Sequence, residues 1–343
     1  MSVRHRGDLA IGVVGGGSWG TTLAHLLARN GNDVLLWVRR KGQATEINKK
    51  HTNERYLPGY TLDPRIRATT RLEDIPYRCQ AILMAVPPSV LREVAFRVGD
   101  HLRGDQILVS ATKGLEDETF YRMSEVLQQE TCCKKIGALS GPNLAREIMD
   151  GQPAATVVAS RFDEVVETID GLLSSPRMRV YGNKDIVGVE LVGALKNILA
   201  IATGVATGMG LGDNAKAFLL TRGLAEISRL GVAAGADPLT IVGLSGVGDM
   251  IATCSSPLSR NHQVGRRLGE GETLPDILDS MVMVAEGVHT ARVAHSYAAT
   301  LGIDMPITRG VFQLLHQGRA AHEVLEDLMG RPSNYEIDGT PIP

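Results

Sequence analysis

The chain has 343 residues, of which 43% are hydrophobic, and this length predicts two domains rather than one core. Its 36 Lys and Arg nearly balance its 38 Asp and Glu, which excludes the broad basic field of a general nucleic-acid or membrane-surface binder. The four cysteines form no CxxC pair and no histidines lie at metal-ligand spacing, so we expect reduced thiols and no metal. The apolar run 9–14 is too short for a signal peptide, and we expect a cytoplasmic protein.

The first predicted unit is a strand, a glycine turn, a helix and a second strand. Residues 9–14 form an apolar run, residues 18–30 have the apolar spacing of a helix, and "DVLLWVRR" at 33–40 follows as a second strand. In this context Gly15 allows a tight turn, Gly17 lets the backbone approach a pyrophosphate, and Gly20 lets the helix pack closely. The pattern is typical of dinucleotide binding, and the alternative is a glycine-rich connection without a ligand.

Short apolar runs alternate with helical patterns as far as about residue 160, which predicts an α/β domain with a mostly parallel sheet. Such sheets bind ligands at the carboxyl ends of their strands, where Pro87, Lys113 and Gly141-Pro142-Asn143 are expected to converge. The alternative for Lys113 is an ordinary solvated loop lysine.

The composition changes after Tyr181. Residues 186–210 carry only Glu190 and Lys196 as charges, and these charges favour a buried core helix over a membrane span. Further helical patterns cover 214–234, 237–244, 262–268, 274–281, 287–301 and 306–316. We therefore predict a Rossmann-type domain over 1–185 and an all-helical substrate-binding domain over 186–343, with a poorly ordered tail "RPSNYEIDGTPIP".

Lys196 is the first candidate for acid–base chemistry. It lies among small and apolar residues of the predicted core helix, where desolvation lowers the pKa of an ammonium group toward the working range of a general acid. The alternatives are a lysine that reaches solvent or one that pairs with a structural carboxylate, Glu190 or another. Asn197 can orient the same ligand or bond to the backbone.

A second candidate group lies in "GLSGVGDMIATCSSPLSRNHQVGRR". Asp249 follows a glycine-rich turn, and Ser259-Arg260-Asn261 come directly before a helical pattern. A hydroxyl, a guanidinium and backbone N–H groups at a helix start suit an oxyanion such as phosphate. The alternative is a helix N-cap beside a solvated arginine.

Several motifs together resemble the NAD(P)-dependent glycerol-3-phosphate dehydrogenases of bacterial type. They are "VVGGGSWGTTLA", "ATKGLE", "SGPNLAREI", "GVELVGALKNILAIATG", "TRGLAEISRLGVAAGADPLTIVGLSGVGDMIATC" and "SRNHQVGRRLGEG", in order from about residue 11 to 330. The resemblance implies a Rossmann domain joined to a helical domain and the reduction of dihydroxyacetone phosphate to sn-glycerol 3-phosphate, the phospholipid backbone. It also implies a cytoplasmic homodimer without a membrane segment.

The resemblance carries roles to individual positions. Lys196 corresponds to the catalytic proton donor, with Lys113 and Asp249 beside it at the substrate. Further substrate positions are Gly141, Asn143, Asn197, Ser259, Arg260 and Asn261. Cofactor positions are Ser18, Trp19, Arg39, Lys113, Ala145, Arg260, Val284 and Glu286, besides Gly15, Gly17 and Gly20. Asn143 replaces a Ser or Thr of many members, and Trp19 replaces a Tyr or Phe of some.

The second strand ends in Arg39-Arg40 and not in the carboxylate typical of NAD-selective domains. We expect NADP or NAD to bind, with NADPH preferred because Arg39 pairs with its 2′-phosphate. The alternative is that these arginines are solvated charges. Two other functions stay open: a related dehydrogenase of hydroxy acids or sugar acids, and a dinucleotide sensor without turnover.

Overall fold

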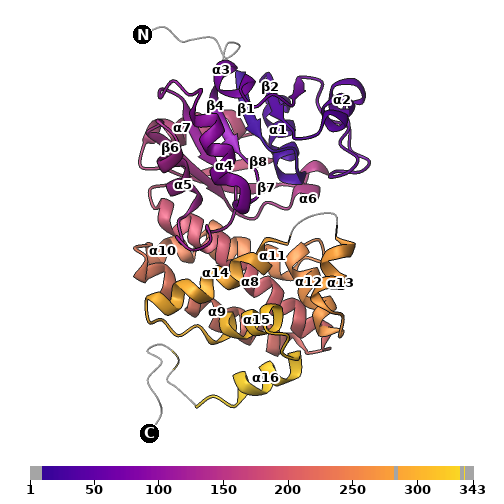
Figure 1. Ribbon diagram of the computed structural model, residues 1–343, viewed down its shortest axis with the longest axis vertical. Coiled ribbons are helices and arrows are strands. Elements are labelled where there is room, and N and C mark those ends of the chain that lie inside the picture. The colour runs from indigo at the N-terminus through magenta and orange to yellow at the C-terminus, as the bar shows by residue number, and fades with distance from the viewer. Residues whose placement is uncertain (1–9, 282–284, 333–335, 337–343) are drawn as a thin grey trace.

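The computed structural model describes residues 10–281, 285–332 and 336. A sheet domain (β1 to β8) and a helical domain (α8 to α16) lie end to end, as Figure 1 shows. Only Lys184 and Asp185 separate the last strand from the first helix of the second domain. Val284 and most of the tail predicted to be poorly ordered lie outside the described residues.

The described strands form one sheet in the order β3-β2-β1-β4-β5-β6-β7-β8. They are β1 (Ala10–Val14), β2 (Val34–Trp37), β3 (Ile66–Thr69), β4 (Cys79–Met84), β5 (Ile107–Ser110), β6 (Lys135–Ser140), β7 (Ala154–Ala159) and β8 (Met178–Asn183). All neighbours pair in parallel except β6 and β7. The predicted α/β class with a mostly parallel sheet is confirmed. The order reverses between β1 and β4, which is where open α/β sheets bind ligands.

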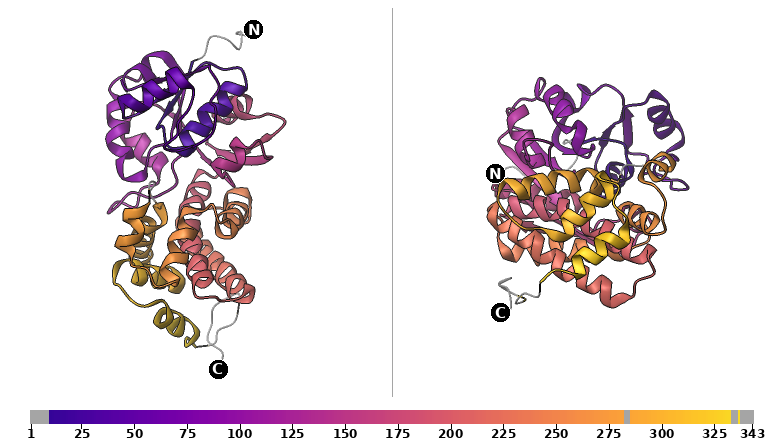
Figure 2. Two further views of the ribbon diagram at one scale, coloured as in Figure 1. Left: turned by 90° about the vertical axis from the view of Figure 1, so that its right-hand side faces the viewer. Right: turned by 60° about the horizontal axis from the view of Figure 1, so that its bottom comes forward.

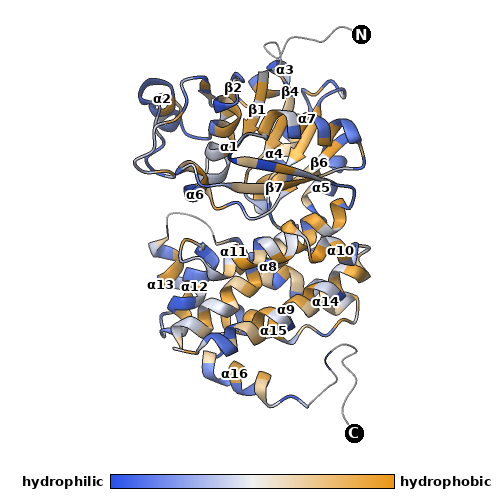
Figure 3. Ribbon diagram, turned by 180° about the vertical axis from the view of Figure 1, so that it is seen from behind, coloured by the Kyte–Doolittle hydropathy of each residue, from blue (hydrophilic) through white to orange (hydrophobic). Residues whose placement is uncertain are grey.

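Helices cover both faces of this sheet. They are α1 (Ser18–Arg29), α2 (Lys41–Lys50), α3 (Asp74–Arg78), α4 (Pro88–Gly99), α5 (Met123–Glu130), α6 (Ala145–Met149) and α7 (Asp163–Leu173). Successive side chains of β1 enter opposite cores: Val13 packs in the cluster that includes α1 and α7, and Val14 in the cluster that includes α4 and α5. The strands are accordingly hydrophobic on both sides, and Figure 3 shows them mainly in orange.

The helical domain is built around α8 (Ile186–Gly208). The other elements are α9 (Asp213–Ala233), α10 (Pro238–Ile241), a π-helical turn η1 (Leu244–Gly248), α11 (Asp249–Ser255), α12 (Arg260–Gly269), α13 (Leu274–Ser280), α14 (Glu286–Thr300), α15 (Pro306–His316) and α16 (Ala321–Met329). The left view of Figure 2 shows these helices gathered below the sheet domain. The helix predicted over 237–244 is wrong in extent, because the chain leaves α10 after Ile241 and widens into η1. Sequence patterns did not predict α11 or α16.

Two helical stretches, Ile186–Gly208 and Pro238–Ser255, are long and apolar enough to cross a membrane. In the first, 94% of the most apolar window is buried inside the protein. The interpretation of this stretch as a core helix is confirmed. Length and apolar composition alone do not separate a core helix from a membrane span.

Glycines bring α12 unusually close to α8. A Cβ atom on Gly204 would lie 2.2 Å from the carbonyl oxygen of His262, and one on Gly265 would lie 2.0 Å from that of Ile201. Any side chain at these positions would push the two helices apart. The contact sets the start of α12, with Ser259 and Arg260, beside the middle of α8, where Lys196 lies.

Candidate active site

The glycine turn after β1 has the geometry that its sequence predicts. Gly15 has φ +121°, and a Cβ there would lie 2.4 Å from the carbonyl oxygen of Ala85. A Cβ on Gly20 would lie 1.9 Å from the carbonyl oxygen of Gly15, so the helix packs on the turn itself. A Cβ on Gly17 would meet no protein atom within 4 Å. The protein therefore needs Gly15 and Gly20 for its own packing, whereas Gly17 faces open space.

The start of α1 is suited to an anion. Its N-cap residue, Gly17, provides no side-chain cap, and the first N–H groups of a helix have no partner within the helix. These groups and the helix dipole attract phosphate. The indole Nε1 of Trp19 is buried and lacks a hydrogen-bond partner within the described residues. An open glycine, an uncapped helix start and an unsatisfied donor together fit a bound dinucleotide.

The other predicted cofactor residues lie on several elements. Ser18 Oγ donates a hydrogen bond to the carbonyl oxygen of Tyr56 over 2.8 Å. Arg39 is exposed two residues beyond β2, whereas Arg40 donates to Tyr56 Oη over 2.9 Å and lies over its ring. Ala145 and Glu286 are the first residues of α6 and α14, and both are partly exposed.

A buried cluster of charges joins the two domains. Lys196 Nζ donates to Asp249 Oδ1 over 2.6 Å and also to Thr253 Oγ1. Lys113 Nζ, from the sheet domain, donates to Asp249 Oδ2 over 2.7 Å and to the carbonyl oxygen of Gly141 over 2.9 Å. One carboxylate therefore binds two ammonium groups, one from each domain. The structure brings together the three residues that the sequence marked as catalytic candidates.

The electrostatics of this cluster follow from its burial. Asp249 is 1% exposed and Lys196 is 4% exposed. Desolvation lowers the pKa of Lys196 to about 8, with a smaller effect in the same direction from Lys113, while Asp249 opposes the shift. Lys196 does pair with a carboxylate, but not with Glu190, which binds Arg122 and Ser124 instead.

The π-helical turn η1 positions Asp249. A Cβ on Gly246 would lie 1.8 Å from the carbonyl oxygen of Ile241, so the chain can fold back this tightly only with glycine. Asp249 follows this turn as the first residue of α11, and Thr253 lies one helical turn later on the same face. Sequence reasoning missed Thr253, because the spacing from Asp249 is informative only once α11 is known.

The predicted phosphate-binding residues lie at the start of α12. Ser259 is its N-cap, and its Oγ accepts a hydrogen bond from His262 N over 3.3 Å, as the alternative interpretation holds. Arg260 is partly exposed in the first helical turn. Asn261 Oδ1 accepts from Gly287 N over 2.9 Å, and a Cβ on Gly287 would lie 2.8 Å from the carbonyl oxygen of Asn197. The starts of α12 and α14 therefore meet beside α8.

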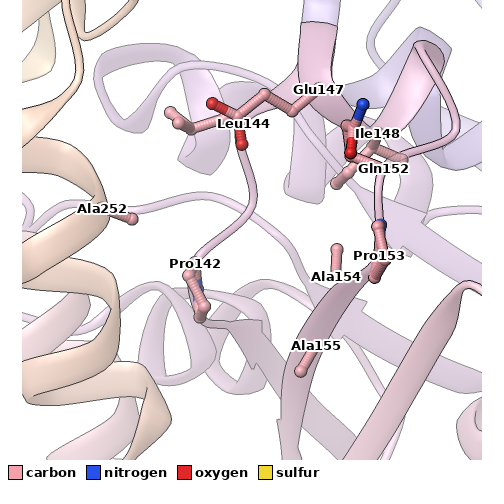
Figure 4. A pocket seen from close by; sticks show the side chains of 9 residues that line it. All are labelled: Pro142, Leu144, Glu147, Ile148, Gln152, Pro153, Ala154, Ala155 and Ala252. Atoms are coloured by element: carbon pink, nitrogen blue, oxygen red, sulfur yellow. The ribbon is translucent and has the colours of Figure 1, made fainter.

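Asn143 has a structural task in its loop. Its Nδ2 donates to the carbonyl oxygen of Ala155 over 3.1 Å, and its Oδ1 accepts from Thr156 Oγ1 over 3.0 Å. The loop also walls a pocket of about 410 Å³, with Pro142 on one side and Ala252 of α11 on the other, as Figure 4 shows. The crevice between the domains thus extends beyond the lysine pair.

Comparisons with known proteins agree with this architecture. The family models for the N-terminus and the C-terminus of NAD-dependent glycerol-3-phosphate dehydrogenase match residues 10–166 and 185–326. A glycerol-3-phosphate dehydrogenase (NAD(P)+) of Corynebacterium diphtheriae is 48% identical over 331 residues, covering 96% of this chain and 100% of the relative. One of Shouchella clausii is 44% identical, covering 96% and 98%.

Solved structures show the same relationship. The crystal structure of glycerol-3-phosphate dehydrogenase from Coxiella burnetii superposes with a TM-score of 0.91 at 35% identity, covering 94% of this chain and 99% of that one. The enzyme from Saccharomyces cerevisiae has a TM-score of 0.81 at 27% identity, covering 94% and 100%. The glycine turn, the lysine pair across the domains and these matches lead to one conclusion: the chain belongs to the NAD-dependent glycerol-3-phosphate dehydrogenase family.

Proposed function

We propose that this NAD(P)-dependent oxidoreductase reduces dihydroxyacetone phosphate to sn-glycerol 3-phosphate, reversibly, and so supplies the backbone of glycerophospholipids. The observation that carries the proposal is the buried cluster in which Asp249 binds Lys196 and Lys113. A dinucleotide sensor without turnover has no need of two ammonium groups held by one buried carboxylate.

The cofactor site is assigned to the glycine turn of residues 15–20 together with Arg39, Ala145, Glu286 and, outside the described residues, Val284. The open space at Gly17 and the unsatisfied Nε1 of Trp19 support this assignment. Bound there, NAD(P)H supplies the hydride that reduces the ketone carbon. Lys113 and Arg260 reach both ligands in this proposal.

Lys196 is the proposed proton donor. Its ammonium group has three N–H donors, of which two are directed at Asp249 and Thr253, so the third is left for a substrate oxygen. As negative charge builds on the carbonyl oxygen, Nζ stabilises that charge and gives up a proton to form the hydroxyl. In the reverse direction, neutral Lys196 takes the proton from the hydroxyl. Asp249 holds both lysines in place throughout.

The phosphate of the substrate is assigned to the start of α12. Arg260 provides a guanidinium there, Ser259 and Asn261 flank it, and Gly141, Asn143 and Asn197 line the neighbouring crevice. Binding energy from this remote group helps to orient the ketone toward the reacting groups. The phosphate contact therefore contributes to the rate as well as to affinity.

A steady-state assay tests the proposed function. The purified chain is mixed with NADPH or NADH and dihydroxyacetone phosphate, and the absorbance of the reduced cofactor is followed. We expect turnover with this substrate and none with hydroxy acids, sugar acids or their keto forms. Turnover only with a carboxylate substrate would select the related dehydrogenase, and cofactor binding without any turnover would select the sensor.

Localisation and assembly belong to the same proposal. The cysteines of the described residues are all free thiols, which supports a reducing compartment such as the cytoplasm. The homodimer rests on the family resemblance. Light scattering after size-exclusion chromatography measures it, and a monomer mass at working concentration would contradict it.

A further inference from the structure

The segment that carries Lys113 reaches from the sheet domain onto the helical domain. We call residues 113–122, between β5 and α5, the tongue. It is a small hairpin: Leu115 and Arg122 form an isolated antiparallel bridge, and Glu116 N donates to the carbonyl oxygen of Tyr121 over 2.9 Å. In Figures 1 and 2 the tongue belongs to the purple loop that leaves the sheet domain toward the helices below.

The stem of the tongue is fixed to the sheet domain. Arg92 of α4 donates to both carboxylate oxygens of Glu116, over 2.6 and 2.7 Å. Such a paired contact restricts the direction of the carboxylate as well as its distance. The stem therefore cannot follow the helical domain freely.

The rest of the tongue is fixed to the helical domain. Leu115 is fully buried and clusters with Leu191 and Ala194 of α8 and Val293 of α14. Beyond it, Asp117 Oδ2 accepts from Arg292 over 2.8 Å, and the ring of Phe120 stacks on that of Tyr297 with centroids 5.0 Å apart. At the end, Arg122 donates to the buried Glu190 over 2.9 Å. These contacts follow one another along α8 and α14.

The tip of the tongue has an unusual backbone. Glu118 and Phe120 have φ of 63° and 59°, a region that residues with a side chain seldom occupy and large ones least of all. Conformations of this kind persist where surrounding contacts impose them. For Phe120 the contact is the stack on Tyr297, so α14 selects the shape of the tip.

We propose that Phe120 and Tyr297 are positioning residues that hold the tongue in the shape that presents Lys113 to Asp249. The inference rests on the proposed function, in which Lys113 acts on the substrate. Lys113 belongs to the sheet domain by sequence, yet its position is set by helix α14 of the other domain. The ring of Tyr297 acts on the reaction through Lys113 and does not touch the substrate.

The decisive experiment is a double-mutant cycle on kcat/KM for dihydroxyacetone phosphate. Tyr297→Ala should lower this value about tenfold, because small displacements of a positioned group are costly, and should leave the KM for NADPH unchanged. Tyr297→Phe keeps the ring and should retain wild-type activity. In a Lys113→Ala background, Tyr297→Ala should cause no further loss, since the group that it positions is gone.

Phe312→Ala is the matched control. It removes a ring that stacks on His295 of the same helix at 4.3 Å, and neither residue lies in or contacts the tongue as described above. This variant should lose thermal stability to a similar extent as Tyr297→Ala while retaining kcat/KM. Equal losses of kcat/KM in Phe312→Ala and Tyr297→Ala, or a full further loss in the Lys113→Ala background, would overturn the inference.

The two proposals fail in different ways. If Lys113→Ala retains full activity with dihydroxyacetone phosphate, the assigned role of Lys113 is wrong. If Lys113→Ala loses activity but Tyr297→Ala does not, the proposed function stands and the positioning role is overturned.

Discussion

The two walls of the crevice are built on different principles. The sheet-domain wall is made of backbone: six consecutive residues, 15–20, set an open glycine and an uncapped helix start. The helical-domain wall is made of buried charge: Lys196 and Asp249 lie 53 positions apart and pair only in the fold. A backbone site is thus specified locally, whereas a buried ion pair depends on the packing that desolvates it.

The strongest way to break this comparison is to remove charge from the helical wall. Lys196→Met should lower kcat by at least ~10²-fold, because a positioned proton donor is lost. Cofactor binding, which the other wall provides, should stay near normal in a fluorescence titration with NADPH. Lys49→Met, at an exposed position in α2, is the control and should behave as wild type. Near-wild-type turnover of Lys196→Met would refute its role.

The matching change in the backbone wall is Gly17→Ala. The added methyl meets no protein atom within 4 Å, so the melting temperature should hold, but it enters the space assigned to the pyrophosphate. A steric conflict of ~1–3 kcal/mol corresponds to roughly a 10- to 100-fold rise in the Kd for NADPH.

Gly171→Ala in α7 is the control for this change, because its methyl also meets open space but lies away from the turn. It should alter neither stability to any large extent nor affinity. If Gly17→Ala binds NADPH as wild type does, the dinucleotide does not pass over this glycine.

Cofactor choice sharpens the comparison further, because it depends on one exposed charge beside the backbone wall. Arg39→Asp should reduce or reverse the expected preference for NADPH by roughly tenfold, as one charge-assisted contact is worth ~1.5–3 kcal/mol. The ratio of kcat/KM for NADPH and NADH measures it. Arg40→Ala is an informative companion, since Arg40 already binds Tyr56. A clear NADH preference in the unmodified enzyme would show that Arg39 does not recognise the 2′-phosphate.

The smallest expected effect is that of pH on the charged wall. Burial lowers the pKa of Lys196 to about 8, and ketone reduction needs the protonated form. The kcat for reduction should therefore fall by roughly twofold between pH 7 and 8 and about tenfold per unit beyond. The kcat for glycerol 3-phosphate oxidation should rise through the same range. Initial rates in both directions from pH 6 to 10 test this, and a flat profile across pH 8 would contradict it.

The sequence predicted the backbone wall well, because Gly15, Gly17 and Gly20 have steric tasks that depend on near neighbours and on one adjacent strand. It identified Lys196 and Asp249 as candidates but left the partner of Lys196 open between Glu190 and another carboxylate. That choice depends on η1 and α11, which form where the glycine-rich sequence reads as a turn.

Two buried carboxylates show what sequence patterns cannot reach. Glu190 accepts from Ser124 N at the start of α5, 66 positions away, and Glu226 accepts from Ile307 N at the start of α15, 81 positions away. Each stabilises the beginning of a remote helix, as a capping side chain does locally. A local pattern contains the donor or the acceptor of such a bond, but not both. The tongue escaped prediction for the same reason.

The burial of α8 has a consequence for biosynthesis. This helix leaves the ribosome first in its domain, while α12 and α14, which cover it, end at residues 269 and 300. At about 5–20 residues per second, a nascent chain displays this apolar helix for roughly 5–20 s before its cover exists. We therefore expect chains truncated after residue 210 to associate with chaperones or to aggregate, and chains extended to residue 332 to stay in solution. A sedimentation assay on stalled nascent chains compares the two lengths, and equal solubility would contradict the expectation.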